Sequence, residues 1–218
     1  FVPGNEINGL TCGGVGSSTV LDHIMVSRSG DDAFEFFGGT VNGKYLIAHN
    51  TYDDDFDTDF GFQGKIQFGL VKRDPNFADV SGSNGFESDN DATGSTNSPQ
   101  TNPTFSNMTV VGPIQNAGDV INVNYKRGAH LRRNTNTDIF NSVIIGYPSG
   151  IMVDGALCEA SATANSLKVQ NSIIAGHNND FEVAVGSSFD ANAWFTTAAY
   201  NNSILDLSSD VMLTDAYN

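Results

Sequence analysis

Three acidic segments of this chain repeat one pattern of carboxylates and phenylalanine. They occupy residues 29–36, 52–59 and 84–91. Each segment places a Phe in a run that alternates as a β-strand does, with carboxylates on the opposite parity. A motif that recurs once per strand and turn is the signature of a solenoid, in which equal positions of successive coils stack. The pattern therefore predicts carboxylates stacked along one face, where they can bind a cation or a polar ligand.

Alignment of these segments with two later runs, at 129–133 and 151–154, predicts the stacking position by position. One inward column is Phe34, Phe56, Phe86, Ala129 and Ile151, and a second is Phe36, Thr58, Ser88, Leu131 and Val153. One outward column is Glu35, Asp57, Glu87, His130 and Met152. The second, beside it, is Phe37, Asp59, Asp89, Arg132 and Asp154. Since stacked coils lie about 4.8 Å apart, the outward carboxylates need a cation, a proton or an Arg to offset their repulsion.

Hard oxygen donors from several coils favour calcium over zinc or copper, which prefer His and Cys. The predicted calcium ligands are Asp31, Asp32, Asp54, Asp55, Asp57 and Asp59. The alternative is that these acids cap turns and face water, with Arg132, Arg133 and Lys44 as counter-charges. Calcium β-rolls carry a repeated GGxGxD nonapeptide, and this chain lacks it.

The same face carries the candidates for ligand binding and for catalysis. The candidate ligand-binding residues are Glu35, Asp57, Glu87, Asp89, Arg132 and Arg133, and the candidate catalytic residues are Asp57, Asp59, His130 and Arg132. Clustered carboxylates can act as acid and base in glycoside hydrolysis, whereas an Arg is a poor base because its pKa exceeds about 12. An acidic ladder closed by arginines, without catalysis, is the favoured interpretation. Four aromatic residues can either stack on sugar rings or fill the core: Phe37, Tyr52, Phe60 and Phe62.

The elements that must position this face are short strands, each ending in branched aliphatic residues. Their expected ranges are 20–26, 41–47, 66–71, 105–111, 139–145, 169–175 and 200–205. An Asn recurs within the last four of them, at Asn107, Asn141, Asn171 and Asn202, which predicts a structural ladder of stacked amides. No window keeps a helical period, so helix is a minor component.

Length and composition set the outer bounds. The 218 residues allow one domain, 1–218, with a loop insertion at about 74–103 and a lateral loop or cap at about 177–199 around Trp194. A net charge of -15 argues against nucleic acid as a partner, and no apolar run is long enough to span a membrane. The chain starts at Phe1, so we expect a processed form or a fragment of a longer chain. Cys12 and Cys158 are compatible with one disulfide or with two buried thiols.

With its coils laid out, the chain resembles the right-handed parallel β-helix proteins of the pectate-lyase-like superfamily. More specifically it is similar to secreted or surface-anchored Bacteroidota proteins, many of them called surface lipoproteins and without an established activity. The residues that carry this resemblance lie at 7–17, 29–40, 53–57, 64–68, 83–91 and 130–134. The resemblance implies an all-β fold, a right-handed single-stranded parallel β-helix (solenoid) with polar loop insertions, and a secreted or cell-surface location.

The sequence thus predicts a β-helix that binds a ligand, which we expect to be a glycan, on an acidic face that can hold Ca²⁺. One alternative is a polysaccharide lyase or glycoside hydrolase acting at the same face. Lyases of this superfamily bind calcium and use an Arg or Lys as the base. Hydrolases of the superfamily carry Gly-His-Gly and Arg-x-Lys elements, and these have no counterpart in this chain. The other alternative is a non-catalytic accessory subunit of a surface assembly, associated with another surface protein such as an outer-membrane protein.

Overall fold

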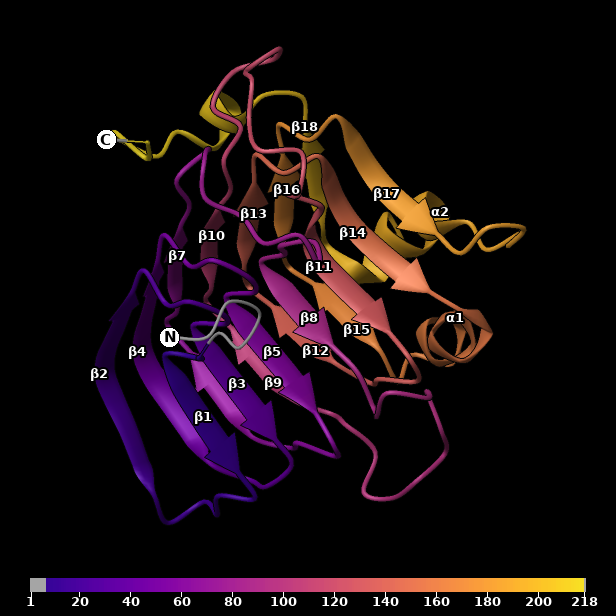
Figure 1. Ribbon diagram of the computed structural model, residues 1–218. Coiled ribbons are helices and arrows are strands. Elements are labelled where there is room, and N and C mark those ends of the chain that lie inside the picture. Colours follow the sequence, from indigo (N-terminus) through magenta and orange to yellow (C-terminus); the bar gives the residue numbers. More distant parts are fainter. Residues whose placement is uncertain (1–6, 218) are drawn as a thin grey trace.

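Seven short strands, one from each turn of the chain, form the first of two parallel sheets in the computed structural model, which describes residues 7–217 (Figure 1). They are β1 (Leu10–Gly13), β3 (Phe34–Phe37), β5 (Phe56–Asp59), β8 (Phe86–Ser88), β11 (Arg127–Arg132), β14 (Ser149–Asp154) and β17 (Asn179–Val183). Their order in the sheet is their order in the chain, and each pairs in parallel with the next. This arrangement is a parallel β-helix, as the repeat predicts.

The second sheet has eleven strands and divides into two faces after its second coil. The two long strands β2 (Val20–Ser27) and β4 (Asn42–His49) pair with each other, and β4 then pairs with both β6 and β7. The remaining strands are β6 (Lys65–Gln67), β7 (Leu70–Lys72), β9 (Thr104–Ser106), β10 (Thr109–Val111), β12 (Asp138–Phe140), β13 (Val143–Ile145), β15 (Lys168–Gln170), β16 (Ile173–Ala175) and β18 (Ser203–Leu205). Together with the first sheet, the two halves give each coil three sides.

A bend separates the two halves, so the runs predicted as single strands, such as 105–111, are in fact two strands. One residue per coil makes this bend with a positive φ between 50° and 60°. These residues are His23, Tyr45, Phe68, Asn107, Asn141, Asn171 and Asn201. The prediction of Asn202 as the fourth Asn is wrong by one residue, because Asn201 occupies the left-handed position that Asn tolerates. Asn202 instead accepts a hydrogen bond from the backbone N–H of Ser172 at 2.9 Å.

The inward columns lie in the predicted register and fill the core. Phe34, Phe56 and Phe86 are fully buried, and their rings stack with centroids 5.2 and 5.8 Å apart. In the second column the hydroxyl groups of Thr58 and Ser88 hydrogen-bond at 2.7 Å, so these two polar side chains are satisfied inside the core. Because the side chains alternate along each strand, this packing directs Glu35, Asp57 and Glu87 to the outer surface.

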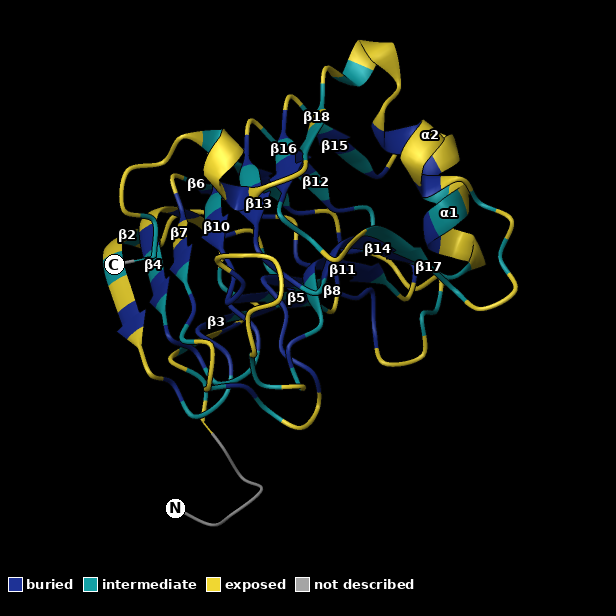
Figure 2. Cartoon of the chain, turned by 90° about the horizontal axis from the view of Figure 1, so that it is seen from above, coloured by how far each residue is buried: buried dark blue, intermediate teal, exposed yellow. Residues whose placement is uncertain are grey.

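The irregular stretches contain more regular structure than their composition indicates. The 177–199 stretch includes the last strand of the first sheet, β17, and two short helices, α2 (Ala191–Phe195) and η1 (Ala198–Tyr200). Trp194 and Phe195 of α2 belong to the core cluster, and Figure 2 shows α2 at the end of the solenoid where β17 lies. Helix α1 (Ala156–Thr163) follows β14, and η2 (Ser208–Val211) lies near the C-terminus. Cys12 and Cys158 are both buried and unpaired.

Candidate functional site

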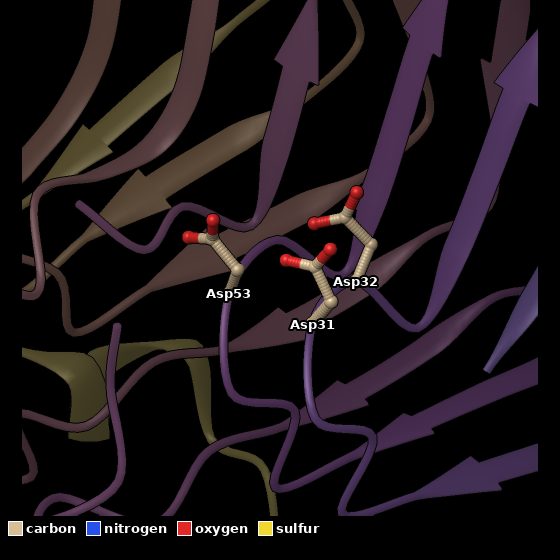
Figure 3. A group of neighbouring side chains, drawn as sticks. All are labelled: Asp31, Asp32 and Asp53. Carbon is tan, nitrogen blue, oxygen red and sulfur yellow. The ribbon is translucent and has the colours of Figure 1, made fainter. Parts of the chain in front are cut away.

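The acidic site begins in the turns that precede β3 and β5. Asp31 and Asp32 lie in the first turn and Asp53 in the second, and each contributes an oxygen to a group whose atoms all lie within 4.8 Å of one another (Figure 3). The turns are held in place by their own carboxylates. The backbone N–H of Asp54 donates to Asp32 at 2.9 Å, and that of Asn84 donates to Asp54 at 2.5 Å. One oxygen of Asp32 and one of Asp54 therefore accept these backbone hydrogen bonds, and the second oxygen of each stays available.

The site continues along the outward column of the first sheet. Glu35 pairs in register with Asp57, and Asp57 with Glu87. Two further groups within the same 4.8 Å limit result: Asp32 with Glu35 and Asp57, and Asp54 with Asp57 and Glu87. Asp32 belongs to the first and second of these groups, and Asp57 to the second and third. The three groups therefore form one continuous acidic site. Asp32 and Asp54 are 6% and 4% exposed, and Asp57 and Glu87 are partly buried.

Among the described residues, the cationic side chains that pair with carboxylates of this site lie at its C-terminal side. Arg132 donates to Glu87 and, at 2.7 Å, to Asp89, while Arg133 donates to Asp89 at 2.8 Å. His130 lies 3.0 Å from Asp154 and 3.5 Å from Glu87. Arg132 and Arg133 thus pair with Glu87 and Asp89. Asp32, Glu35, Asp54 and Asp57 make no ion pair with any residue in the described part of the chain.

The pKa values follow this division of charge. Burial, together with the neighbouring carboxylates, raises the pKa of Asp32, Asp54 and Asp57 well above the usual range. Burial also raises the pKa of Glu35 to about 7, although Asn8 donates a hydrogen bond to it. Burial acts on Glu87 as well, but the hydrogen bond from His130 and the charge of Arg132 outweigh it, so the pKa of Glu87 is lowered. The carboxyl groups on the side of the site away from Arg132 and Arg133 are therefore the ones that bind protons more readily.

We expect the metal-free protein to lose stability as the pH rises from about 4 to about 7. Carboxyl groups such as Glu35, with its pKa raised to about 7, and Asp53, with its pKa raised to about 6, bind more protons when folded than when unfolded. Their destabilising effect is absent below the unfolded pKa values near 4 and complete above the folded ones. Urea unfolding in EDTA at several pH values measures this slope. A midpoint that rises across this interval would contradict the assignment of raised pKa values.

The residues present fit a calcium ion. Oxygens that bind one calcium ion lie no more than about 5 Å apart, because each Ca–O distance is about 2.3–2.6 Å, and the three acidic groups meet that limit. Asp57 Oδ1 and Asp53 Oδ1 are buried and accept no hydrogen bond from a described residue. A buried oxygen without a partner is costly unless a cation or a proton satisfies it. The donors are all oxygens, as calcium prefers.

Two of the predicted calcium ligands lie outside these groups. Asp55 takes the position of Ala33 and Gly85 in the neighbouring coils, so its side chain points into the interior and accepts a hydrogen bond from Arg73 at 2.8 Å. Asp59 accepts a hydrogen bond from the backbone N–H of Phe60. Asp31, Asp32, Asp54 and Asp57 do belong to the groups. Asp53 joins them although the predicted ligand set omits it, and its alignment with Asp31 in the repeat is the signal that finds it.

Arg73 is the residue that sequence reasoning missed. It is fully buried, and it donates to the carbonyl oxygens of Thr51 and Asn84 at 2.6 Å each and to that of Asp53. Together with its hydrogen bond to Asp55, these contacts fasten the turn that carries the acidic residues to the turn of the next coil. No repeat marks Arg73, because the positions that align with it are Asn50 and Gly112.

Two hollows lie beside the loop formed by residues 91–99, close to the C-terminal ends of β5, β11 and β14. The first, of about 440 Å³, is lined by Phe60 and by residues of that loop. The second, of about 370 Å³, is lined by Arg132, Arg133, Asp154 and the start of α1. Volumes of this size are typical of small-ligand sites, for which about 300 Å³ is the lower bound. The loop is fastened by Asp91, which accepts hydrogen bonds from the backbone N–H groups of Thr93 and Ser95.

The candidate aromatic residues divide between the surface and the core. Phe60 is 57% exposed, and its ring lies 5.8 Å from that of Phe37 at the edge of the acidic site. Phe62 is fully buried and stacks on Phe36, so it fills the core. Tyr52 is partly buried against Phe77. Phe60 is therefore the exposed one of the four and can offer its ring to a ligand.

The coil register defines the class of protein: a parallel β-helix, here with a carboxylate-rich outer face. The family model described as the pectate-lyase-like beta helix domain matches residues 1–210, and the chain belongs to this family. No curated protein and no solved structure matches the chain. Within residues 7–217 none of the helices has the length and apolar character needed to cross a membrane.

Proposed function

We propose that this protein binds a glycan on the acidic face of its first sheet, with Ca²⁺ held by Asp32, Glu35 and Asp57. The observation that carries the proposal is the buried, unpartnered Oδ1 of Asp57, which belongs to two of the three carboxylate groups. A calcium ion there would satisfy this oxygen and offset the repulsion between the coils. It would also offer open coordination positions to sugar hydroxyl or carboxylate oxygens.

The surroundings of the site favour a glycan as the ligand. The exposed ring of Phe60 lies at one hollow, and Arg132, Arg133 and Asp154 line the other. Aromatic rings pack against the apolar faces of sugars, while charged and amide groups hydrogen-bond to sugar hydroxyl groups. The resemblance to secreted and surface proteins leads us to propose a secreted or cell-surface location, where polysaccharides are accessible. Cell fractionation tests that location.

Affinity electrophoresis in gels that contain xylan, galactan, alginate or polygalacturonate tests the binding. We expect one or more of these polymers to retard the protein in calcium and not in EDTA. Phe60→Asn, which suits the positive φ at that position, is expected to weaken the retardation, and Asp57→Asn to abolish its calcium dependence. Val120→Ala, at a valine that is 93% exposed and far from the site in sequence, is the matched control. If the protein migrates equally far in gels with and without each of the four polymers, binding to these glycans is refuted.

One observation favours catalysis as a second candidate. Asp57 and Glu87 belong to one carboxylate group, yet the pKa of Asp57 is raised and that of Glu87 is lowered. Neighbouring acids with pKa values pushed apart are the arrangement that acid–base catalysis of glycosidic cleavage uses. Incubation with the same four polymers, followed for reducing ends and for unsaturated products, tests it. If the protein is an enzyme, Asp57→Ala and Arg132→Ala abolish turnover while the fold survives.

A further inference from the structure

The turns before β3 and β5 hold a carboxylate group that is separate from the glycan site. Asp31 and Asp32 come from the first turn and Asp53 from the second, and each contributes an oxygen that lies within 4.8 Å of the other two. Figure 3 shows the three carboxyl groups gathered at the two turns. Of these residues, Asp32 alone also belongs to the group with Glu35 and Asp57 that we assign to the glycan-binding ion. The state of the individual oxygens decides whether the turns hold an ion of their own.

Asp53 has an oxygen that no residue within 7–217 satisfies. Ser81 donates a hydrogen bond to Asp53 Oδ2 at 2.6 Å, whereas Asp53 Oδ1 is shielded from solvent and accepts no hydrogen bond. A carboxylate oxygen that lacks both water and a donor is costly unless a cation or a proton satisfies it. This observation is independent of the one at Asp57, because Asp53 and Asp57 share no group. It therefore indicates a ligand at the turns themselves.

Asp32 adds a second oxygen without a donor. The residue is 6% exposed, and its Oδ1 accepts a hydrogen bond from the backbone N–H of Asp54 at 2.9 Å. No residue in the described part of the chain donates to its other oxygen. The flanking coils place Asn8 and Asn84 at this position of the repeat, and both of their amide groups donate to carboxylates. A cation can take the place at Asp32 and Asp54 that an amide group has in those coils.

The charges of Asp32 and Asp53 are not paired with a basic side chain. Neither residue makes an ion pair with any other residue that the structure describes. Arg73 donates to the main-chain carbonyl oxygen of Asp53, but its charge is paired with Asp55. The carboxylate of Asp79 lies beside the group, because one hydroxyl group donates to both Asp53 and Asp79. The single ion of the proposed function therefore offsets only part of the negative charge around the turns.

We propose that a second calcium ion binds between the two turns, held by Asp31, Asp32 and Asp53, with Asp32 shared between this ion and the ion of the glycan site. The inference rests on the proposed function for the first ion and on the buried Oδ1 of Asp53 for the second. The ligands are all carboxylate oxygens, and their separation suits Ca–O distances of about 2.3–2.6 Å. The shared carboxylate lies between the two ions, and its negative charge reduces their repulsion.

The second ion has a structural role, because its ligands come from two successive coils. Asp31 and Asp32 precede β3, and Asp53 precedes β5. Two hydrogen bonds already join these turns: the backbone N–H of Asp53 donates to the carbonyl oxygen of Asp31 at 3.3 Å, and that of Asp54 donates to Asp32. An ion that binds both turns fixes their spacing. It thereby fixes the position of Asp32, which the glycan-binding ion also uses.

The number of bound ions tests the proposal with calcium alone. Equilibrium dialysis against calcium, followed by elemental analysis, is expected to give two ions per wild-type chain. We expect one ion for Asp53→Asn, for Asp31→Asn and for Asp57→Asn, and none for Asp53→Asn/Asp57→Asn. Asp180→Asn, on β17 and outside the three groups, is the control and should keep two. An Asn at position 53 can still accept the hydrogen bond from Ser81, so the fold is expected to survive, and melting in EDTA checks this.

The pattern of loss separates this inference from the proposed function. A single wild-type ion that is lost in Asp57→Asn and kept in Asp53→Asn would overturn the second site and leave the proposed function intact. A single ion with the reverse pattern would support the site between the turns and refute the ion of the glycan site. One ion lost in both variants, or two ions kept in Asp53→Asn, would overturn the second site. No bound ion would overturn both.

Glycan retardation supplies a readout other than ion binding. Asp53→Asn is expected to keep the calcium-dependent retardation, because the group of Asp32, Glu35 and Asp57 stays complete in this variant. Asp57→Asn is expected to lose that dependence. If Asp53→Asn binds one ion and yet loses the calcium dependence, the ion between the turns is the one that binds the glycan, and the structural role is refuted.

Discussion

Saturating calcium is expected to raise the melting temperature of this protein by about 5–10 °C. An ion that binds only the folded state adds about 2.7 kcal/mol at a hundred times its dissociation constant, and 1 kcal/mol corresponds to roughly 2–4 °C in a chain of this size. The physical reason is the group of Asp32, Glu35 and Asp57, none of which makes an ion pair with a described residue. Differential scanning calorimetry with calcium and with EDTA measures the shift.

Asp57→Asn tests this prediction most sharply, because the variant is expected to change the melting temperature in opposite directions without and with calcium. Without calcium the variant is expected to melt at a higher temperature than the wild type, since one member of a repelling, buried set becomes neutral. With calcium it is expected to lose most of the shift. Asp180→Asn, on β17 of the same sheet and outside the three groups, should keep the full shift. Equal melting temperatures with calcium and with EDTA in the wild type would show that no ion binds.

Removal of Arg73 is expected to destabilise the protein by about 3–5 kcal/mol, which is the usual cost of leaving one member of a buried ion pair alone. Arg73→Met leaves Asp55 charged in the core and three carbonyl oxygens without their donor. Arg73→Lys is expected to be almost as severe, because an ammonium group cannot reach four acceptors in a fixed plane. Urea unfolding measures both variants, with Lys126→Met as the control, which should stay within about 0.5 kcal/mol of the wild type.

A double variant separates the ion pair from the remaining contacts of Arg73. Arg73→Met/Asp55→Asn removes the unpaired buried charge, so it should be no less stable than Arg73→Met alone. Strict additivity of the two single losses would contradict the pairing. Arg73→Met should also reduce the melting shift in calcium, because Arg73 fastens the carbonyl oxygen of Asp53 within the turn that carries Asp53 and Asp54.

The repeat determined the fold and the composition of the acidic face. Side chains in a strand alternate with period two, so the position of one Phe per coil decides which residues face inward, and Glu35, Asp57 and Glu87 follow on the outside. The family match over residues 1–210 agrees with that interpretation. The bends were harder to place, because each left-handed residue lies in the middle of a run whose composition suits a single strand. Asn marks it in the later coils and aromatic residues mark it in the earlier ones.

Only the tertiary structure decided which carboxylates act together. Asp53, Asp54 and Asp55 are adjacent and chemically identical, yet Asp53 and Asp54 join the acidic groups and Asp55 turns inward to Arg73. The difference arises from Arg73, an arginine eighteen residues away that no repeat marks and whose Nε donates to Asp55. The sequence by itself determined the stack of coils and the acid on its outer face. The contacts between coils decided where that acid is paired and where it remains available to a cation.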